Sequence, residues 1–172
     1  GGKVFYMAHR LGKDGKPFRM FKFRSMIENA PDIRNSDNST YSSANDPRLT
    51  RVGKFLRETS IDELPQILNV LLNQMSFIGP RPDPLDSYDR RTDEQKRRYS
   101  VKPGISGYTQ AYYRRSLPSL EKLNRELYYV DNISFWFDVK IFFKTISKVF
   151  KRENIYSNMN DVNIKEKFSN QD

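Results

Sequence analysis

Hydrophobic and polar positions alternate near the start of the chain, which is the spacing expected of β-strands. Two aromatic-rich segments are separated by turn residues at 12–15. This pattern predicts a β-hairpin over residues 4–23. We expect its apolar side chains on one face and Arg19, Lys22 or Arg24 on the other, where the simplest interpretation is a solvated strand face.

Further along the chain, apolar residues recur at the spacing of α-helices. Residues 28–47 are rich in Asn, Ser and Asp, which predicts a long loop that is either a lid or binding element or a disordered insertion. Pro103-Gly104 predicts a type II turn within residues 101–107. The expected helices are 54–72 in two pieces, a polar helix over 86–99, and helices over 120–130 and 133–150.

The order of these elements predicts an α+β fold: a single, mostly helical domain with a small N-terminal β-hairpin. We assign this domain to residues 1–155, because no internal repeat or second boundary is visible. Residues 156–172 are polar and are expected to form a flexible tail.

The amino-acid composition limits the kinds of site and partner that the chain can have. The 172 residues include 30 Lys and Arg against 21 Asp and Glu, a net charge of +9 that favours an anionic partner such as nucleic acid, phospholipid or a phosphorylated substrate. The absence of cysteine excludes disulfides, thiolate metal sites and cysteine nucleophiles, and the single His9 excludes a histidine metal cluster. No apolar run reaches the roughly 20 residues needed to span a bilayer. Because the chain begins at Gly1 rather than Met, we expect a missing upstream segment.

The acidic pair Asp62-Glu63 lies where a helix is expected to begin. Pro65 suits the first turn of a helix, and an apolar helical run follows at 67–72. Two N-caps are possible: Asp62 itself, or Ser60 with Glu63 completing a capping box. Either choice places both carboxylates at the positive end of a helix.

That position favours ionised carboxylates and creates a natural phosphate site. An ionised carboxylate beside a bound phosphate can attack phosphorus as a nucleophile, provided that cations offset the repulsion. The alternative is that Asp62 and Glu63 are ordinary helix caps, which is common for acids at this position.

Basic residues that can offset the charge flank the acidic pair. Arg57 precedes it by five residues, and Arg81 is held between Pro80 and Pro82, whose rigidity would reduce the entropy lost when the arginine binds a phosphate. Lys102 lies in a similar Pro-Gly setting. An ordinary surface loop is the alternative for the Pro-Arg-Pro element. A divalent ion is also expected, because carboxylates with waters suit Mg²⁺ and phosphoryl transfer generally uses it.

The last expected helix is amphipathic. Lys140, Lys144 and Lys148 form a stripe opposite a large apolar arc. Such a helix suits the surface of an anionic membrane leaflet, although packing against the protein's own core with a solvated lysine face explains the pattern equally well. The arc consists of Phe135, Trp136, Val139, Phe142, Phe143, Ile146, Val149 and Phe150.

Together these segments resemble the monotopic phosphoglycosyl transferases, the bacterial sugar transferases that begin capsule, exopolysaccharide and glycan assembly. The combination of DELPQ, GPRP and KPGISG in this order is highly specific to them. The matching stretches are GKPFRMFKFRSM at 15–26, DPRLTRVGKFLRETSIDELPQILNVL at 46–71, MSFIGPRP at 75–82, VKPGISGYTQ at 101–110 and LYYVDNISFWFDVKIFFKT at 127–145.

The resemblance implies transfer of a sugar phosphate from a UDP-sugar to undecaprenyl phosphate, with release of UMP. It implies that Asp62 is the nucleophile of a covalent, two-step reaction and that Glu63 helps to hold Mg²⁺, so that Asp62 and Glu63 are also the expected metal ligands. Binding of phosphate or substrate is expected of Arg57, Pro80, Arg81, Pro82, Lys102, Lys22 and Arg24.

Members of this family also carry an N-terminal re-entrant membrane helix, and nothing here matches it. The chain therefore resembles the family's soluble part, expected at the cytoplasmic face of the bacterial plasma membrane. Three positions depart from the family pattern: Ala8 replaces a Gln, Asn73-Gln74 replaces Gly and an acid, and Tyr108 replaces a Trp. We expect Ala8, Tyr108 and residues 112–115 to influence the choice of sugar rather than the reaction.

Two other classes of function fit the composition. A basic nucleic-acid-binding domain would explain the charge, but no standard motif of that class appears and the acidic pair beside arginines would be unexplained. A non-catalytic, membrane-bound scaffold would explain the fold, but not an intact Asp62-Glu63 pair. We therefore expect an enzyme that binds no nucleic acid.

Overall fold

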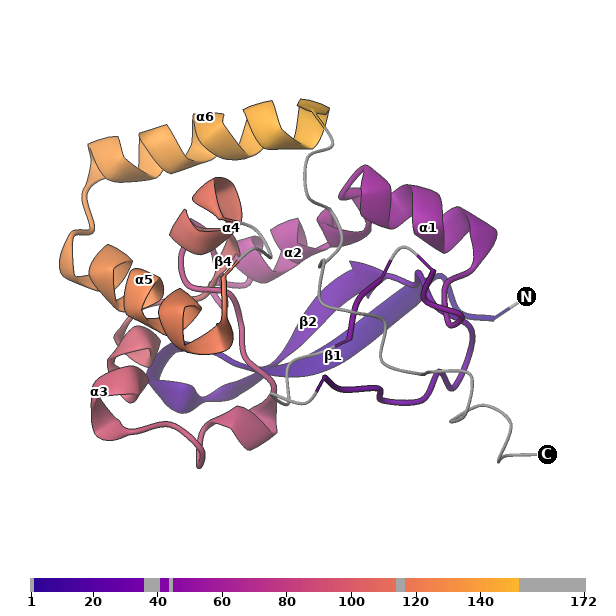
Figure 1. The fold of residues 1–172 in the computed structure, drawn as a ribbon, viewed down its shortest axis with the longest axis horizontal. Coiled ribbons are helices and arrows are strands. Elements are labelled where there is room, and N and C mark those ends of the chain that lie inside the picture. Colours follow the sequence, from indigo (N-terminus) through magenta and orange to yellow (C-terminus); the bar gives the residue numbers. More distant parts are fainter. Residues whose placement is uncertain (1, 36–40, 44, 114–116, 152–172) are drawn as a thin grey trace.

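The computed structural model describes residues 2–35, 41–43, 45–113 and 117–151 of the chain. The fold is α+β and mostly helical, as predicted, with a β-hairpin along one side and helices packed above it (Figure 1). In chain order the elements are β1 (Phe5–Leu11), η1 (Lys13–Gly15), β2 (Pro17–Phe23), α1 (Arg51–Glu58), η2 (Ile61–Glu63), α2 (Gln66–Leu71), β3 (Ser76–Ile78), η3 (Leu85–Ser87), α3 (Asp93–Lys96), η4 (Arg97–Ser100), β4 (Gly104–Ser106), α4 (Tyr108–Tyr112), α5 (Ser119–Asp131) and α6 (Phe135–Lys151), where η denotes a 3-10 turn.

The predicted hairpin is confirmed, but one of its basic residues faces the other way. β1 and β2 pair antiparallel, with Ala8 opposite Met20. Because side chains alternate along a strand, Lys22 shares the buried face of Met20 and Phe18, and only 16% of its side chain is exposed. The prediction of a solvated Lys22 is therefore wrong, whereas Arg19 is exposed as expected.

Two hydrophobic clusters form the core. The first joins the inner face of the hairpin to the segment that follows α2, and the second joins β3, α4, α5 and α6. Their buried members are Ala8, Phe18, Met20 and Met75 in the first cluster, and Ile78, Ala111, Tyr129 and Ile141 in the second.

The helical region before residue 72 consists of two pieces, as predicted, but its second piece begins differently. Thr50 caps α1 through its side chain, and Ser60 then takes a left-handed conformation with φ of 60°. Asp62 and Glu63 lie in η2, ahead of α2, and Ser60 makes no side-chain cap. Ser60 is thus the N-cap residue of η2, as one alternative proposed, but it forms no capping box with Glu63. Asp62 lies inside η2 and is not an N-cap, and the α-helix itself begins only at Gln66.

The segment around Pro103-Gly104 forms a strand rather than a type II turn. β4 pairs in parallel with β3, and Ser76 lies opposite Gly104. A type II turn requires positive φ at its third residue, and Gly104 does not have it. Gly104 is needed instead for close approach, because a Cβ there would lie 2.2 Å from the Gly79 nitrogen.

The polar helix predicted over residues 86–99 is much shorter in the structure. Regular α-helix is limited to α3, which begins after a capping box formed by Thr92 and Gln95, and η4 follows it directly. The residues before Thr92 form η3 and a turn. The charge pattern had suggested one continuous helix, but the cap at Thr92 marks where helix begins.

Two other predictions lie partly outside the described residues. In its described part, the stretch 28–47 contains no helix and no strand longer than a single bridge, in agreement with the predicted loop. Whether that loop acts as a lid stays a prediction. The polar tail, 156–172, lies outside the described residues.

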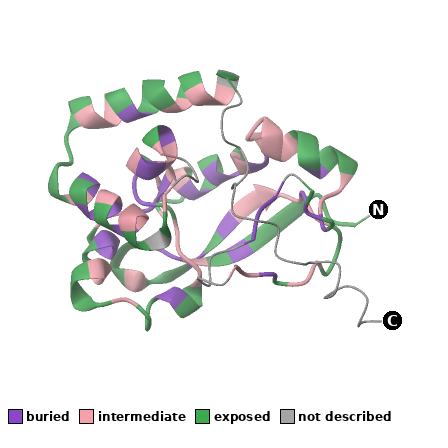
Figure 2. Ribbon diagram, in the orientation of Figure 1, coloured by how far each residue is buried: buried purple, intermediate pink, exposed green. Residues whose placement is uncertain are grey.

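The two C-terminal helices, α5 and α6, are confirmed close to their predicted bounds. α6 packs on the protein through Ile141, which is fully buried, and through a hydrogen bond of 2.6 Å between Ser106 Oγ and Thr145 Oγ1. Lys144 lies over the ring of Tyr112. Most of the apolar arc that the structure describes is exposed (Figure 2), so the alternative in which this arc packs against the core is wrong.

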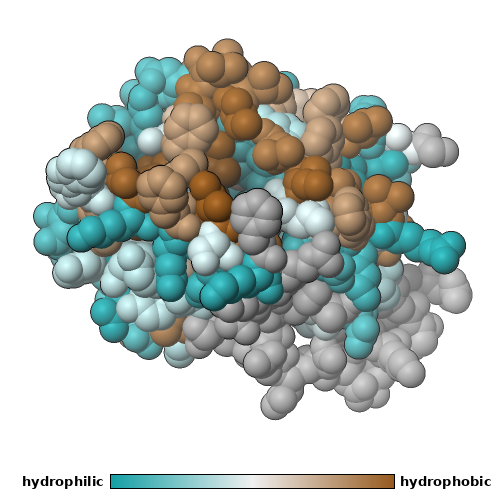
Figure 3. All heavy atoms as spheres, turned by 90° about the horizontal axis from the view of Figure 1, so that it is seen from above, coloured by the Kyte–Doolittle hydropathy of each residue, from teal (hydrophilic) through white to brown (hydrophobic). Residues whose placement is uncertain are grey.

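Helices α1, α2 and α6 share one face of the molecule, and hydrophobic side chains gather there (Figure 3). No helix within the described residues is long and apolar enough to cross a bilayer. The exposed apolar side chains of this face are Val52 and Phe55 on α1, Leu64, Ile67, Leu68, Leu71 and Leu72 in and next to α2, and Phe135, Trp136, Phe142, Phe143 and Ile146 on α6. We call this surface the apolar face.

Candidate active site

The acidic pair is held against the hairpin by a buried asparagine in α2. Asn69 is completely buried, and its Nδ2 donates to the Arg19 carbonyl oxygen at 2.7 Å while its Oδ1 accepts from the Phe21 N–H at 2.9 Å. These two bonds satisfy the free edge of β2, which would otherwise carry unpaired backbone groups. They also fix the distance between α2 and the strand that carries Lys22.

Arg57 reaches the site from α1, which crosses the end of the hairpin at Ser25. The crossing is so close that a Cβ on Gly53 would lie 1.8 Å from the Ser25 carbonyl oxygen. The side chain of Ser25 then accepts a hydrogen bond from Arg57 Nε at 3.0 Å. A glycine on the inner face of α1 therefore allows the helix to approach closely enough for this bond.

Glu63 is paired with two cations from different elements. Its Oε1 lies 2.8 Å from Lys22 Nζ on β2 and 3.1 Å from Arg81 Nη2 in the Pro-Arg-Pro loop. Burial opposes the ionisation of Glu63, but the charges of Lys22 and Arg81 outweigh it and hold its pKa far below the usual range. Burial in turn lowers the pKa of Lys22. Glu63 is thus an ionised carboxylate that organises the cations of the site.

Asp62 differs from its neighbour. It is 8% exposed, and within the ranges that the structure describes its carboxylate accepts no hydrogen bond. Burial raises the pKa of Asp62, and the charges of Lys22, Arg57 and Arg81 offset this only in part. The helix-terminus argument predicted a well-stabilised anion, but this residue is a poorly solvated one, which is the form that makes a carboxylate reactive. We call Lys22, Asp62, Glu63 and Arg81 the dyad cluster.

The Pro-Arg-Pro loop is fixed from both sides. The Pro80 carbonyl oxygen accepts a hydrogen bond from the Gly104 N–H at 3.0 Å, and the Gly79 N–H donates to the Ser106 carbonyl oxygen at 2.9 Å. The Arg81 carbonyl oxygen accepts from Arg98 Nη2 at 2.8 Å. The backbone of Arg81 is therefore anchored while its guanidinium extends to Glu63.

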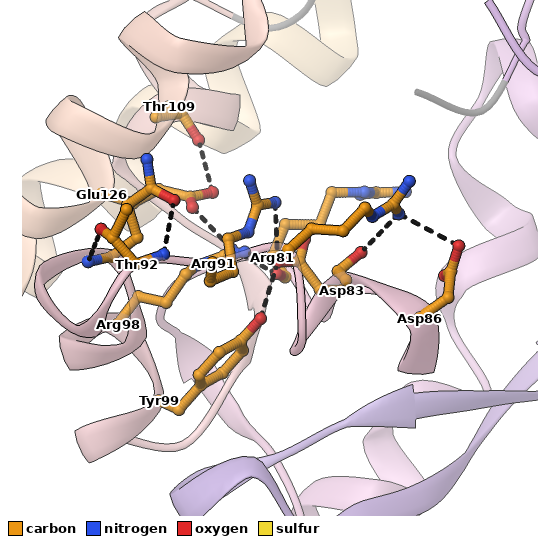
Figure 4. A network of polar contacts seen from close by, with 12 residues as sticks. Arg81, Asp83, Asp86, Arg91, Thr92, Arg98, Tyr99, Thr109 and Glu126 are labelled. Atoms are coloured by element: carbon orange, nitrogen blue, oxygen red, sulfur yellow. Dashed lines mark hydrogen bonds and ion pairs between the residues drawn. The ribbon is translucent and has the colours of Figure 1, made fainter. Parts of the chain in front are cut away.

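Behind this loop lies a buried set of charges that we call the Arg98 network: Asp83, Arg91, Arg98 and Glu126 (Figure 4). Arg98, with 2% of its side chain exposed, contacts Asp83 and lies 2.5 Å from Glu126 on α5. Asp83 also accepts from Arg91 at 3.0 Å and from the Tyr99 hydroxyl at 3.0 Å. The network joins the loop that carries Arg81 to α5.

Two predicted binding residues lie away from the acidic pair. Lys102 Nζ contacts Asn73 Oδ1 at the end of α2, and Arg24 pairs with Glu28 at 3.8 Å. The structure thus brings together Asp62, Glu63, Lys22, Arg57 and Arg81, with Pro80 and Pro82 beside Arg81. Roles for Lys102 and Arg24 in binding stay predictions.

A metal ion would find few protein ligands here. Among the described residues, no three acidic or histidine side chains lie close enough to hold one. Asp62 has free carboxylate oxygens, whereas Glu63 Oε1 already contacts Lys22 and Arg81. This donor set suits Mg²⁺, which binds through one or two carboxylates while phosphate oxygens and waters fill its other positions.

The sequence interpretation missed four residues that build the site: Ser25, Asn69, Arg98 and Glu126. Asn69 interrupts an otherwise apolar helical run, and a polar residue on a buried face signals a hydrogen-bonding role. Ser25 next to an aromatic strand gave no comparable signal. Arg98 and Glu126 gave no local signal, because their pairing joins residues distant in the chain.

Comparison with known proteins places the chain in a family. The family model described as bacterial sugar transferase matches residues 1–152. The uncharacterized sugar transferase EpsL of Bacillus subtilis is 42% identical over 155 residues, covering 90% of this chain and 74% of EpsL. The UDP-glucose:undecaprenyl-phosphate glucose-1-phosphate transferase of Escherichia coli is 41% identical over 163 residues, covering 90% of this chain and 34% of that protein.

A third relative is the UDP-N-acetylgalactosamine-undecaprenyl-phosphate N-acetylgalactosaminephosphotransferase of Aeromonas hydrophila, 40% identical over 154 residues, with 86% of this chain and 36% of the relative covered. The chain thus spans about a third of the length of several relatives. The matched region, residues 1–152, contains the acidic pair and the Pro-Arg-Pro loop. The chain belongs to the bacterial sugar transferase family.

Proposed function

We propose that this chain is the catalytic domain of an enzyme that transfers a sugar-1-phosphate from a UDP-sugar to undecaprenyl phosphate and releases UMP. One observation carries the proposal: a partly buried carboxylate, Asp62, has no hydrogen bond within the described residues and lies among Lys22, Arg57 and Arg81. The names of the E. coli and A. hydrophila relatives, both undecaprenyl-phosphate sugar phosphotransferases, support the substrate classes.

The reaction proceeds in two displacements at one phosphorus atom. A carboxylate oxygen of Asp62 attacks the sugar-bearing phosphorus of the UDP-sugar, and the bond from that phosphorus to the UMP oxygen breaks. An acyl phosphate carrying the sugar remains on Asp62 while UMP leaves. A phosphate oxygen of undecaprenyl phosphate then attacks the same phosphorus and displaces the Asp62 carboxylate, which regenerates the enzyme.

The cations of the site make this approach of anions possible. Arg81 and Lys22 already oppose the charge of Glu63, and Arg57 lowers the pKa of Asp62. Fixed positive groups of this kind stabilise the charge that develops on the transferring phosphoryl group and on the leaving phosphate. Mg²⁺, held by Asp62 and Glu63 together with substrate oxygens, would add Lewis-acid neutralisation of the diphosphate.

The test is to follow the nucleotide product and the protein mass together. Full-length protein in lipid vesicles is mixed with a panel of UDP-sugars, with and without undecaprenyl phosphate. We expect UMP release that requires the acceptor for turnover, and, without acceptor, a mass increase of one sugar phosphate located on Asp62. Release of UDP instead of UMP would contradict the proposal, as would an adduct on another residue.

We further propose that the apolar face lies on the cytoplasmic surface of the bacterial plasma membrane. The acceptor is a membrane lipid, and Asp62 lies directly next to Leu64, an exposed residue of this face. Large aromatic side chains on α6 suit the boundary between headgroups and acyl chains. The orientation brings η2, and with it the reactive carboxylate, to the depth of the lipid phosphate.

Vesicle binding tests this orientation. Phe143→Ser, on α6, should weaken binding to vesicles containing anionic lipid by about tenfold, because a buried aromatic side chain contributes roughly 1.5–3 kcal/mol. Leu85→Ser removes an exposed apolar residue from η3, outside the apolar face, and serves as the control. Equal losses in the two variants would argue against this face. A gel shift with salt titration distinguishes the nucleic-acid-binding alternative, for which we expect no specific complex.

A further inference from the structure

Arg10, near the end of β1, is a half-buried arginine that forms no ion pair with any residue the structure describes. Its guanidinium donates one hydrogen bond, from Nη1 to the His9 carbonyl oxygen at 3.0 Å. In the part of the chain that the structure describes, no carboxylate forms an ion pair with it. Buried cations are normally paired, so an unpaired one is unusual and needs an explanation.

The strand register places Arg10 on the same face of the hairpin as Lys22. Arg10 lies opposite Phe18, and Ala8 lies opposite Met20. Opposed residues of antiparallel strands share a face, so this face carries Arg10 at one end, an apolar middle and Lys22 at the other end. Four residues of strand separate their positions by roughly 13 Å. Arg10 therefore extends toward the side of the hairpin that faces the dyad cluster.

The edge of β1 also contacts the Pro-Arg-Pro loop. The Leu11 N–H donates to the Asp83 carbonyl oxygen at 2.9 Å. Leu11 shares with Pro80 and Arg81 the wall of a small cavity of about 10 Å³, which is room for about one water molecule. Arg10 is therefore next to the loop that aims Arg81 at Glu63.

Among the described residues, the carboxylate whose charge acts on Arg10 is that of Asp83, and it is already paired with other arginines. The Asp83 carboxylate already accepts hydrogen bonds from Arg98, Arg91 and the Tyr99 hydroxyl. Burial lowers the pKa of Arg10, Tyr6 and Asp83 raise it, and the positive charges of Arg81 and Arg34 lower it. Arg81 is paired with Glu63, and Arg34 is paired with Asp32 and Asp86, whereas Arg10 has no ion pair among the described residues. A bound phosphate, which accepts two parallel N–H bonds from a guanidinium, would balance the charge of Arg10.

We propose that Arg10 and Arg81 together bind a phosphate group of the substrate. This inference rests on the proposed function, which supplies two phosphate sources: the diphosphate of the UDP-sugar and the head group of undecaprenyl phosphate. The interaction is the same for both sources: a guanidinium donates two parallel hydrogen bonds to phosphoryl oxygens. Arg10 would hold one end of the phosphate that Arg81 contacts, on the side away from Lys22.

The experiment compares two arginines of the same hairpin. Arg10→Met removes the charge and keeps the length of the apolar stem, and Arg10→Lys keeps the charge without the fork. Arg19→Met is the matched control, because Arg19 is exposed and lies on the opposite face. Inorganic pyrophosphate and UDP are titrated into each protein by calorimetry, and melting temperatures verify that the variants fold.

We expect Arg10→Met to weaken pyrophosphate binding by about 10- to 100-fold, which is the usual loss for a hydrogen-bonded charge. Arg10→Lys should lie between this variant and the parent, and Arg19→Met should stay within about twofold of the parent, since a distant exposed charge contributes little. Affinities that fall equally in Arg10→Met and Arg19→Met would overturn the inference.

Steady-state kinetics of full-length enzyme in vesicles then identifies the source of the phosphate. A higher KM for the UDP-sugar in Arg10→Met assigns the phosphate to the donor, and a higher KM for the lipid assigns it to the acceptor. Unchanged KM values together with unchanged pyrophosphate affinity overturn the inference even if the parent enzyme is active. If the parent enzyme releases no UMP but Arg10→Met still binds pyrophosphate more weakly than the parent does, the proposed function fails and the anion site stands.

Discussion

The dyad cluster and the Arg98 network contain the same formal charges, two cations and two carboxylates each, but pair them differently. In the network, Asp83 and Glu126 both contact the guanidinium of Arg98. In the dyad cluster, Lys22 and Arg81 converge on one oxygen of Glu63. Asp62 beside them receives no hydrogen bond from any residue that the structure describes.

The difference shows how a protein can make one carboxylate reactive without changing the total charge. Burial raises the pKa of Asp62 and also that of Glu126. Glu126, however, is held by Arg98 and by a hydrogen bond of 3.4 Å from Thr109 Oγ1. Three cations close to Asp62, namely Lys22, Arg57 and Arg81, stabilise it through space rather than by a hydrogen bond, which leaves its oxygens available to a substrate. Both carboxylates of the network are in ion pairs, whereas one carboxylate of the dyad cluster, Asp62, has no ion pair among the described residues.

The largest expected effect comes from removing the unpaired carboxylate. Asp62→Asn should lower turnover by at least about 10⁴-fold, because the amide cannot act as the nucleophile. UMP release and the covalent mass adduct are the measurements. Turnover within tenfold of the parent would reject Asp62 as the nucleophile.

The same change should also stabilise the fold at neutral pH. A carboxyl group whose folded pKa is raised stabilises the protein below its unfolded pKa, and this contribution is lost as the pH rises through the folded pKa. At pH 7 the ionised Asp62 is therefore a cost that asparagine removes, and an increase in Tm of about 2–4 °C is expected for each 1 kcal/mol. At pH 3, where Asp62 is protonated in both states, the difference from the parent should vanish.

Breaking the Arg98 network should affect stability most. Arg98→Met leaves Asp83 and Glu126 buried without their shared cation, which typically costs about 3–5 kcal/mol of unfolding free energy. Arg90→Met is the control, because Arg90 and its partner Asp86 are both exposed, and a change under about 1 kcal/mol is expected there. Denaturant unfolding measures both, and equal losses would show that the network contributes no more than a surface pair.

Removing the charge of Glu63 should have an intermediate effect on stability. Glu63→Gln deprives buried Lys22 of its partner, so we expect a loss of about 1–3 kcal/mol at pH 7. Since the folded pKa of Glu63 is lowered, its contribution is present above the unfolded pKa and disappears as the pH falls. Glu28→Gln alters an exposed pair with Arg24 and should change stability little. Equal changes in the free energy of unfolding in Glu63→Gln and Glu28→Gln would show that Glu63 does not organise the cations.

The smallest expected effect is a displaced pH profile. Because the nucleophile must be ionised and the pKa of Asp62 is raised, the acid limb of kcat/KM should lie above the ordinary aspartate pKa of about 3.9. The profile is measured with a saturating lipid acceptor. An acid limb at or below that value would mean that the surrounding cations offset burial completely.

The local pattern of apolar and polar residues predicted the hairpin and the two C-terminal helices, because these elements depend mainly on residues that are close together in the chain. The closeness of Arg81 to the acidic pair was also expected from the sequence and is found in the structure, whereas the catalytic roles of these residues stay predictions. The orientation of Lys22 was not predicted, because both faces of β2 carry apolar residues and the partner of Lys22, Glu63, lies 41 positions away in the chain. Gly104 was assigned to a turn because its partner strand, β3, is equally remote from it in the chain.

The parallel pairing of β3 with β4 has a consequence for how the protein is made. Arg81 is anchored through Gly104 and Ser106, which are synthesised more than twenty positions later. A nascent chain that has already produced Asp62 therefore lacks the support that directs the arginine toward it. Contacts between remote segments form late in folding. The enzyme should therefore remain inactive on the ribosome until the second half of its chain has emerged.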